Sequence, residues 1–252
     1  MTQKIIAFVN QKGGVGKTTT VINVAAQIAT DNHKVLLLDM DPQGNASSGL
    51  GIVDHQHLTT YDVICNGQDI SEAIIKTHVA KLDILPSNSN LAGAEIDLVA
   101  KKNREFILSN SLKQLNYDFI LIDCPPSLGL LTINALTAAT DIIIPVQAEY
   151  YALEGLSQLL NTIQAVKGST NPNLELLGIV ITMFDKRNSL SDQVQKELEN
   201  YFGDKLLNNS IPRNVRLAEA PSYGRTIYEH DKWSKGARSY KALTREILNL
   251  FK

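Results

Sequence analysis

Several classes of protein are excluded by what the sequence lacks. Its 252 residues include only two cysteines, Cys65 and Cys124, whose positions fit neither a metal site nor a disulfide framework. No apolar run is long enough to span a bilayer, and no signal peptide precedes the first strand-like segment. A disulfide-stapled secreted domain and an integral membrane protein are therefore excluded, and we expect a cytoplasmic protein with no membrane partner.

The chain also lacks a long Pro-, Gly- or Ser-rich linker, a low-complexity segment and an internal repeat. Its composition, with 44% hydrophobic and 20% charged residues, is that of an ordinary globular protein. At this length one large core can form. We therefore expect a single domain over residues 1–252, with a less regular insertion at about 46–80.

The charges are divided unevenly along the chain. Residues 1–204 hold 14 Lys and Arg against 22 Asp and Glu, whereas residues 205–252 hold 10 against 4, within a net charge of −2. Chance clustering at one end of a chain would explain this division, and so would a surface that binds a polyanion. Composition alone leaves both explanations open.

Apolar segments alternate with segments of helical periodicity. The apolar segments are mostly continuous, which is typical of parallel strands buried on both faces. Alternation of such strands with helices predicts an α/β fold, a doubly wound and mostly parallel sheet with helices on both faces. The expected strands are 5–9, 35–38, 82–85, 119–122, 142–146 and 176–181, and the expected helices are 18–30, 91–115, 128–138, 152–167, 190–202 and about 237–251.

A glycine-rich loop lies between the first expected strand and the first expected helix. Glycine lets successive backbone N–H groups turn toward an anion, and the start of a helix favours negative charge. The lysine of such a loop places its charge on the β- and γ-phosphates of a nucleotide, and the next hydroxyl binds Mg²⁺. The sequence therefore predicts a phosphate-loop NTPase whose loop reads Lys12-Gly13-Gly14-Val15-Gly16-Lys17-Thr18-Thr19.

The loop departs from the usual phosphate-loop pattern at its start. Gln11 stands where that pattern has glycine, and a second lysine, Lys12, opens the loop. A solvent-exposed side chain is the ordinary outcome for lysine. A second phosphate ligand is the alternative, and the residues alone leave the choice open.

Three aspartates directly follow expected strands. Asp39 and Asp41 come after 35–38, and Asp123 comes after 119–122. In an open parallel sheet, ligands bind at the carboxyl ends of the strands. Asp is also common in turns at such places, but three of them beside a phosphate loop favour a nucleotide and metal site.

Together with the loop, four further motifs resemble the ParA/Soj branch of the ParA–MinD ATPases, and the resemblance covers nearly the whole chain. The loop is similar to the deviant Walker A loop of that superfamily. The other motifs are LLDMDPQGN at 37–45, IDCPPS at 122–127, EYYALEG at 149–155 and IPRNVRLAEAPS at 211–222. The last two point to the branch that partitions chromosomes and plasmids.

This resemblance implies a Mg²⁺-dependent ATP hydrolase. Asp123 corresponds to the Walker B aspartate, which holds Mg²⁺ together with Thr18, and Asp39 to a support of the metal shell. Asp41 corresponds to the residue that orients the attacking water, so Lys12, Lys17 and Asp41 form the expected catalytic set.

The resemblance also implies a dimer and a site for the adenine base. Lys12 is expected to reach across an ATP-dependent homodimer to the ATP of the other subunit. Within 211–222, Pro212 and Asn214 are expected to contact adenine. A Pro-Arg-Asn sequence is also typical of an ordinary turn.

The family binds DNA as the ATP-bound dimer and without sequence preference, which requires clustered cations rather than base reading. A ParB/Spo0J-like centromere-binding protein then stimulates hydrolysis and releases the dimer from the nucleoid, and this cycle segregates a chromosome or a plasmid. A solvated surface is the ordinary alternative for each cation. The expected DNA contacts are Arg187, Arg213, Arg216, Lys235 and Arg238.

A MinD-like membrane-associated positioning ATPase is the alternative function, because it shares the loop and the aspartates. Its distinguishing feature is a C-terminal amphipathic helix that lies on lipid. The last expected helix is amphipathic, with Tyr240, Leu243, Ile247 and Phe251 on one face. Since this face is continuous from Tyr240 onward, docking on the core of the protein is the simpler explanation.

Overall fold

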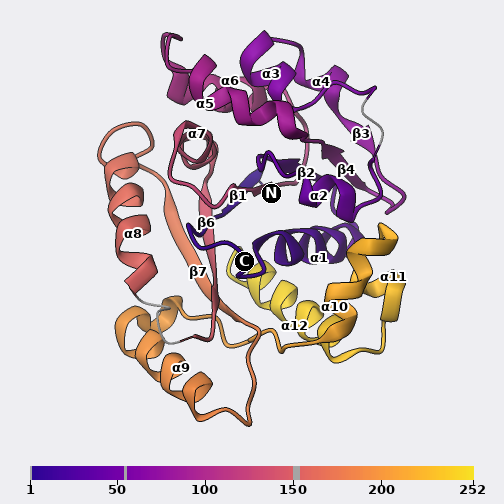
Figure 1. The fold of residues 1–252 in the computed structure, drawn as a ribbon, viewed down its shortest axis with the longest axis vertical. Coiled ribbons are helices and arrows are strands. Elements are labelled where there is room, and N and C mark those ends of the chain that lie inside the picture. The colour runs from indigo at the N-terminus through magenta and orange to yellow at the C-terminus, as the bar shows by residue number, and fades with distance from the viewer. Residues whose placement is uncertain (1, 54–55, 150–153) are drawn as a thin grey trace.

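A seven-stranded sheet forms the centre of the molecule in the computed structural model, which describes residues 2–53, 56–149 and 154–252. The strand order is β3-β4-β2-β5-β1-β6-β7, and every pairing is parallel except that of β3 with β4. The strands are β1 (Lys4–Phe8), β2 (Val35–Asp39), β3 (Ile75–Lys76), β4 (Leu82–Leu85), β5 (Phe119–Asp123), β6 (Asp141–Gln147) and β7 (Glu175–Thr182). The predicted doubly wound sheet is confirmed (Figure 1).

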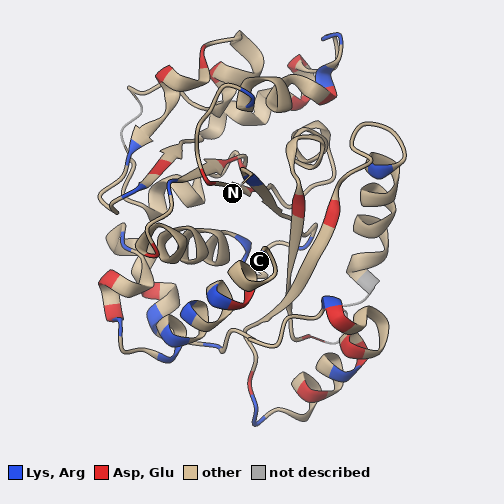
Figure 2. Ribbon diagram, turned by 180° about the vertical axis from the view of Figure 1, so that it is seen from behind, with Lys and Arg blue, Asp and Glu red and all other residues tan. Residues whose placement is uncertain are grey.

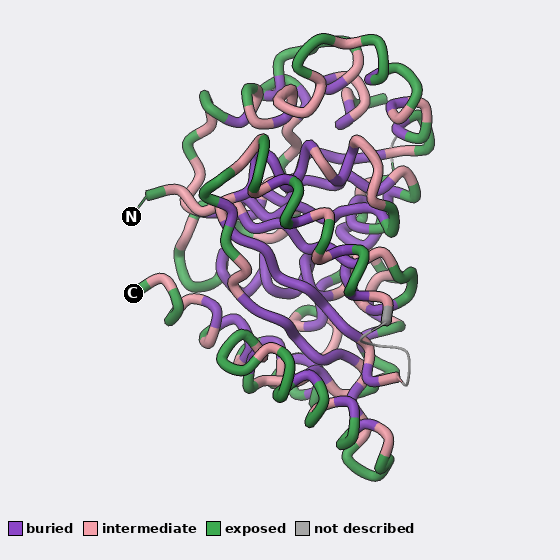
Figure 3. The backbone as a smooth tube through the Cα atoms, turned by 90° about the vertical axis from the view of Figure 1, so that its left-hand side faces the viewer, coloured by how far each residue is buried: buried purple, intermediate pink, exposed green. Residues whose placement is uncertain are grey.

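Each face of the sheet has its own apolar core, because successive side chains of a strand point to opposite faces. In β1, Ile6 and Phe8 belong to one core and Ala7 to the other. The strands are consequently buried along most of their length (Figure 3). The core of Ile6 and Phe8 also holds residues of α1 (Lys17–Thr30), α2 (Asn45–Gly49), α10 (Val215–Glu219), α11 (Ile227–Asp231) and α12 (Lys235–Asn249).

The second core lies under the remaining α-helices. These are α3 (Thr60–Asn66), α4 (Ile70–Ala73), α5 (Ala94–Asp97), α6 (Ile107–Leu112), α7 (Leu130–Ala138), α8 (Glu154–Lys167) and α9 (Ser189–Phe202). All six expected strands are found within one residue of their expected ends. Continuous apolar runs therefore located the buried strands well.

The expected helix over 91–115 is wrong. This segment contains the end of a 3₁₀ turn at Ser89–Gly93, then α5, a second 3₁₀ turn at Arg104–Phe106, and α6. Asn103 has φ 52°, a left-handed conformation that an α-helix cannot pass through. The segment 46–80 is more regular than expected, because it holds most of α2 together with α3, α4 and β3. These elements are too short to show a clear periodicity.

The C-terminal segment packs against α1, and α12 lies beside it (Figure 1). Tyr240, Leu243 and Ile247 are each at most 1% exposed, so the apolar face of α12 is covered by the core. The Phe251 ring continues this packing at 6.1 Å from the ring of Phe119. Docking of this helix on the core is thereby confirmed. Within the described residues, no helix is both long and apolar enough to cross a bilayer.

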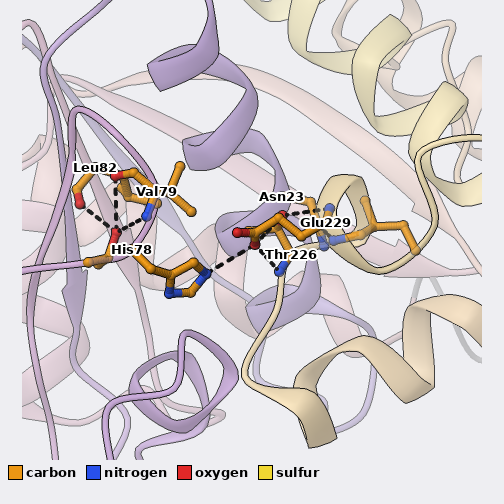
Figure 4. A network of polar contacts seen from close by, with 8 residues as sticks. Asn23, His78, Val79, Leu82, Thr226 and Glu229 are labelled. Atoms are coloured by element: carbon orange, nitrogen blue, oxygen red, sulfur yellow. Dashed lines mark hydrogen bonds and ion pairs between the residues drawn. The ribbon is translucent and has the colours of Figure 1, made fainter.

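A polar network joins α1 to α11 and to the loop between β3 and β4 (Figure 4). The backbone N–H of Ile227 donates to Asn23 Oδ1 on α1 at 2.9 Å. At the start of α11, the Thr226 N–H and hydroxyl both donate to Glu229 Oε2, at 3.0 and 2.9 Å. The Nε2 atom of His78 lies 3.1 Å from the same oxygen. The C-terminal helices are therefore tied to the helix that follows the phosphate loop.

We predict that Asn23→Ala lowers the free energy of unfolding by about 1–3 kcal/mol, because it leaves the buried N–H of Ile227 without an acceptor. His78→Ala is the matched control in the same network. Since the contact of His78 with Glu229 is well exposed, its loss should cost at most about 1 kcal/mol. Urea denaturation measures both values, and equal small losses would contradict the role given to Asn23.

Candidate functional site

The glycine-rich loop forms the turn between β1 and α1. Gly14 and Gly16 have φ 74° and 82°, which glycine adopts without the steric cost that a Cβ brings. Above Gly13 and Gly14 a Cβ would meet no atom within 4 Å, so the loop faces open space. Gly16 is the N-cap of α1, and no side chain caps this helix. The first N–H groups of α1 are therefore available to an anion.

Lys17 is the first residue of α1, and its side chain lies among carboxylates. Only 6% of the residue is exposed, and its Nζ donates to the backbone oxygen of Lys12 at 3.4 Å. Burial lowers the pKa of Lys17, whereas the nearby charges of Asp123 and Asp41 oppose that shift. A buried ammonium group is stabilised by negative charge close to it. Lys17 is therefore suited to bind the phosphate oxygens of a nucleotide.

Asp123 ends β5 and is completely buried between β1 and β2. Neither of its oxygens has a hydrogen-bond partner of good geometry in the described part of the chain. Burial raises its pKa well above the usual value, and the neighbouring charge of Asp39 adds to the rise. The Thr18 hydroxyl and the Lys17 ammonium act in the opposite direction. A buried carboxylate without partners beside a hydroxyl fits a hard cation such as Mg²⁺.

Among the described residues, no three acidic, histidine or cysteine side chains gather closely enough to hold a metal by themselves. This agrees with the way in which Mg²⁺ is usually bound, through one or two carboxylates together with phosphate and water oxygens.

Asp39 lies beside Asp123 in the register of β2 and β5, but its oxygens are already used. Its Oδ1 accepts the N–H of Asp41 at 3.1 Å, and its Oδ2 accepts the N–H and hydroxyl of Ser47 at 2.9 and 2.7 Å. Burial raises the pKa of Asp39 to about 6, although these hydrogen bonds lower it. The geometry favours an anchor for the Asp41 loop and for α2 over a direct metal ligand. A contribution of Asp39 to the metal shell stays a prediction.

Asp41 lies in a cleft of about 450 Å³ together with the phosphate loop. The residue is 7% exposed, and its Oδ1 accepts the N–H of Gln43 at 2.9 Å. The cleft is also lined by Lys17, Thr18 and Pro126, so the carboxylate faces the same space as the loop. A carboxylate in this position can orient a water molecule for attack on a phosphate.

A smaller pocket of about 190 Å³ continues from this cleft, with which it shares Gly16, Thr19 and Met183. Its wall is the segment 211–214, which contains the expected base contacts Pro212 and Asn214. The Asn214 side chain also caps α10, because its Oδ1 accepts the N–H of Arg216 at 2.9 Å. The structure thus brings the phosphate loop and the expected adenine segment together.

Lys12 lies apart from this cleft. Its Nζ is 2.6 Å from Glu149 Oε2 in the same chain, and Glu149 also accepts a hydrogen bond from Gln147 at 2.5 Å. Lys12 lines a neighbouring cavity of about 660 Å³, which shares Pro126 with the cleft of the phosphate loop. Of the 149–155 motif, residues 150–153 lie outside the described residues. In this chain the second lysine is therefore paired with a carboxylate rather than directed at the phosphate site.

The expected DNA contacts differ in their surroundings. Arg216 is paired with Glu219 at 2.8 Å and with Asp231 at 3.7 Å, and Arg187 is paired with Asp185 at 3.1 Å. Arg213 is exposed and lines the pocket of segment 211–214.

Lys235 and Arg238 have no ion pair within the described residues. They share the exposed face of α12 with Lys241 and Arg245, and these four cations follow the helical spacing of one face. Figure 2 shows Lys and Arg gathered over this end of the molecule. Part of the C-terminal excess of cations therefore lies on one exposed helix face.

Sequence reasoning missed several residues that line the site. Tyr240 of α12 and Thr182 and Met183 at the end of β7 line the pocket of segment 211–214. For Tyr240 the sequence predicts only a place on an apolar helix face. The left-handed φ of 52° at Met183 has no signal in the sequence.

Comparison with known proteins places this geometry in a family. The AAA domain family matches residues 3–176. The sporulation initiation inhibitor protein Soj of Bacillus subtilis is 52% identical over 247 residues, which is 97% of this chain and 98% of the relative. The chromosome partitioning protein ParA of Myxococcus xanthus is 52% identical over 248 residues, covering 97% of this chain and 88% of the relative.

Solved structures of other proteins share the fold of this chain over nearly its whole length. Cobyrinic acid a,c-diamide synthase from Mycobacterium smegmatis, with bound ADP and magnesium, is 36% identical with a TM-score of 0.87, covering 99% of this chain and 95% of that chain. A putative plasmid partition protein from Borrelia burgdorferi bound to AMPPNP is 28% identical with a TM-score of 0.82, covering 99% and 98%.

We predict that Asp41→Ala lowers the rate of ATP hydrolysis by about 10²–10⁴-fold, the range for removal of a group that accepts a proton or orients water. Nucleotide binding should survive, because the loop and Lys17 are untouched. Steady-state phosphate release and binding of a fluorescent ATP analogue measure the two effects. Asp41→Asn is the control, since it keeps an acceptor for the Gln43 N–H and removes only the charge. Hydrolysis at the wild-type rate in both variants would show that another group orients the water.

Proposed function

The chain belongs to the ParA/Soj family of chromosome-partitioning ATPases, and from this premise we propose how its site binds and hydrolyses ATP. Residues 1–252 act as one ATPase domain. The phosphates of ATP lie on the loop 12–19, and the adenine lies against 211–214. One observation carries this proposal: the cleft that contains Lys17, Thr18 and Asp41 continues into the pocket of Pro212 and Asn214.

Mg²⁺ would be held by Thr18 and Asp123, with phosphate and water oxygens completing its shell, and would neutralise charge on the phosphate oxygens. The unpartnered carboxylate of Asp123 supports this assignment. Lys17 binds the β- and γ-phosphates from the start of α1. Asp41 accepts a hydrogen bond from the attacking water and thereby orients it toward the γ-phosphorus. Asp39 keeps Asp41 in position through the hydrogen bond to its N–H.

A homodimer forms when ATP is bound, and Lys12 contributes to it. The lysine is 43% exposed, so its pair with Glu149 is well solvated and stabilises the chain little. Breaking this ion pair so that Lys12 can bind phosphate oxygens of the other subunit's ATP therefore costs little free energy. Lys12 then supplies the second cation that phosphoryl transfer requires as charge develops.

We predict that Lys12→Ala weakens the ATP-dependent dimer and leaves ATP binding measurable, because Lys17 remains on the phosphates. Sedimentation with a slowly hydrolysed ATP analogue measures the dimer fraction. Lys167→Ala is the matched control, since it also removes a partly exposed lysine from a surface ion pair. An unchanged dimer fraction in Lys12→Ala would return Lys12 to the role of a solvated surface residue.

The ATP-bound dimer binds nucleoid DNA without sequence preference, and a ParB-like partner stimulates hydrolysis and releases it. The cation-bearing face of α12 and the neighbouring Arg216 support the DNA interaction, because clustered Lys and Arg are what phosphate contacts need. Burial of Tyr240, Leu243 and Ile247 argues against the membrane alternative, since it leaves α12 no broad apolar face for lipid.

We predict that Arg216→Glu weakens DNA binding on every sequence and makes the dependence of log affinity on log salt shallower, by about 0.9 for each DNA phosphate that is no longer neutralised. ATP-driven dimerisation should persist. Lys167→Glu reverses a charge at the end of α8 and should leave this slope unchanged. The competing role of Arg216 is to order, through α10, the pocket of segment 211–214, which we propose binds adenine and call the base pocket. A fall in ATP affinity in step with DNA affinity would support that role and remove Arg216 from the DNA surface.

A further inference from the structure

Helix α12 has two faces that serve different parts of the molecule. Its outer face presents Lys235, Arg238, Lys241 and Arg245 to solvent. Its inner face packs on α1 and buries Tyr240, which also lines the base pocket. One rigid element therefore touches both the nucleotide pocket and the surface proposed for DNA.

The Tyr240 hydroxyl is linked to the backbone of the phosphate loop. It lies 3.1 Å from Thr20 Oγ1 in the first turn of α1, and the Thr20 hydroxyl donates to the Gly16 backbone oxygen at 2.7 Å. Because Thr20 has only one hydroxyl proton, Tyr240 is the donor in the first of these bonds. The chain of hydrogen bonds thus runs from α12 through Thr20 to the glycine that begins α1.

A second interaction joins α12 to the other wall of the base pocket. The Glu246 carboxylate accepts four hydrogen bonds from the backbone and side chains of Asn208 and Asn209, at 2.6 to 3.0 Å. Only Ser210 separates these residues from the pocket segment 211–214, whose Ile211 N–H donates to the Ile181 backbone oxygen of β7 at 2.8 Å. Since Tyr240 and Glu246 lie on one helix, the two walls of the base pocket share a common support.

The start of α12 is held in a similar way. The preceding helix α11 is bonded to α1 through Asn23 (Figure 4), and Ser234 caps α12 through the N–H of Ala237 at 3.1 Å. Trp233, the only tryptophan of the chain, lies immediately before this cap and is 77% exposed. Its fluorescence therefore reports on the end of α12 that begins the row of cations.

We propose that α12 couples the nucleotide pocket to the basic surface, and that the hydrogen bond from Tyr240 to Thr20 is the interaction on which this coupling depends. ATP in the pocket holds the start of α1 and segment 211–214 in place. Because Tyr240 and Glu246 bond these parts to α12, the position of α12 depends on the bound nucleotide. Thermodynamic linkage requires that DNA on the outer face tighten ATP binding by the same factor. This inference rests on the proposed function, in which the outer face of α12 binds DNA.

Tyr240→Phe tests the coupling, because it keeps the ring in the pocket and removes only the hydroxyl. The quantity measured is the ratio of DNA affinity with a saturating, slowly hydrolysed ATP analogue to DNA affinity without nucleotide. Saturating each variant separately keeps any change in ATP affinity out of the ratio, and comparing the variants at equal dimer fraction, measured by sedimentation, keeps out any change in dimerisation. We expect the ratio to fall about three- to tenfold, the range that one net hydrogen bond accounts for.

Tyr228→Phe is the matched control. Tyr228 packs against the same core, and its buried hydroxyl has no hydrogen-bond partner in the described part of the chain. Removal of this hydroxyl should leave the ratio at the wild-type value. A wild-type ratio in Tyr240→Phe, or an equal fall in both variants, would overturn the proposal.

Trp233 fluorescence tests the link between the nucleotide pocket and α12 without DNA. At a protein concentration where sedimentation shows a single species, the ATP analogue should change the fluorescence of wild type and of Tyr228→Phe, and should change that of Tyr240→Phe much less. If wild type binds no DNA with the analogue, the proposed function fails, yet this signal still tests the link between pocket and helix. An equal change in Tyr240→Phe and wild type would overturn that link.

Thr20→Val adds a double-mutant cycle. Thr20→Val also removes the bond to Gly16, so if the two hydroxyls act through one hydrogen bond, the combination of Thr20→Val and Tyr240→Phe should reduce the DNA ratio no more than Thr20→Val alone. A combined reduction equal to the product of the single reductions would show that the two residues act independently, and would overturn the assigned hydrogen bond.

Discussion

Two carboxyl groups buried side by side at the centre of the sheet are the constraint on which the site depends. Asp39 and Asp123 end neighbouring parallel strands in register, and neither is exposed to solvent. Burial raises the pKa of both carboxyl groups, and the charge of Asp39 adds to the rise at Asp123. Such a pair is tolerated only where donors or cations compensate it. The two carboxyl groups are compensated in different ways.

Asp39 is compensated by the protein itself, and this sets the shape of one wall of the cleft. Its bonds to Ser47 and to the Asp41 N–H fix α2 and the turn between them, and Ser47 Oγ in turn accepts the N–H of Ser87. A Cβ on Gly44 would lie 2.9 Å from the Ser87 oxygen, so this turn also requires glycine. Asp123 has no such hydrogen-bond partner in the described part of the chain, so its carboxyl group is available to the Mg²⁺ that we propose there. The same two carboxylates thus build the scaffold and the reactive centre.

The C-terminal segment completes the site from outside the sheet. It supplies the wall 211–214 and, through α12, the Tyr240 side chain of the base pocket. Its outer side carries the excess of cations that the chain as a whole balances with acids elsewhere. Because one segment forms both a pocket wall and a basic surface, changes at the pocket have a short physical route to that surface.

The sequence by itself determined six of the seven strands (all but β3), the phosphate loop and the positions of the three aspartates. Each of these is a local signal: a continuous apolar run, a glycine spacing, or an acid directly after a strand. Tertiary structure decided what each side chain contacts. Lys12 pairs with Glu149 and Thr20 with Tyr240 across 137 and 220 positions of the chain, and no local pattern encodes such partners. The helix break at Asn103 and the use of both Asp39 oxygens likewise depend on the packed neighbours, since a hydrogen bond exists only where folding brings donor and acceptor to the same place.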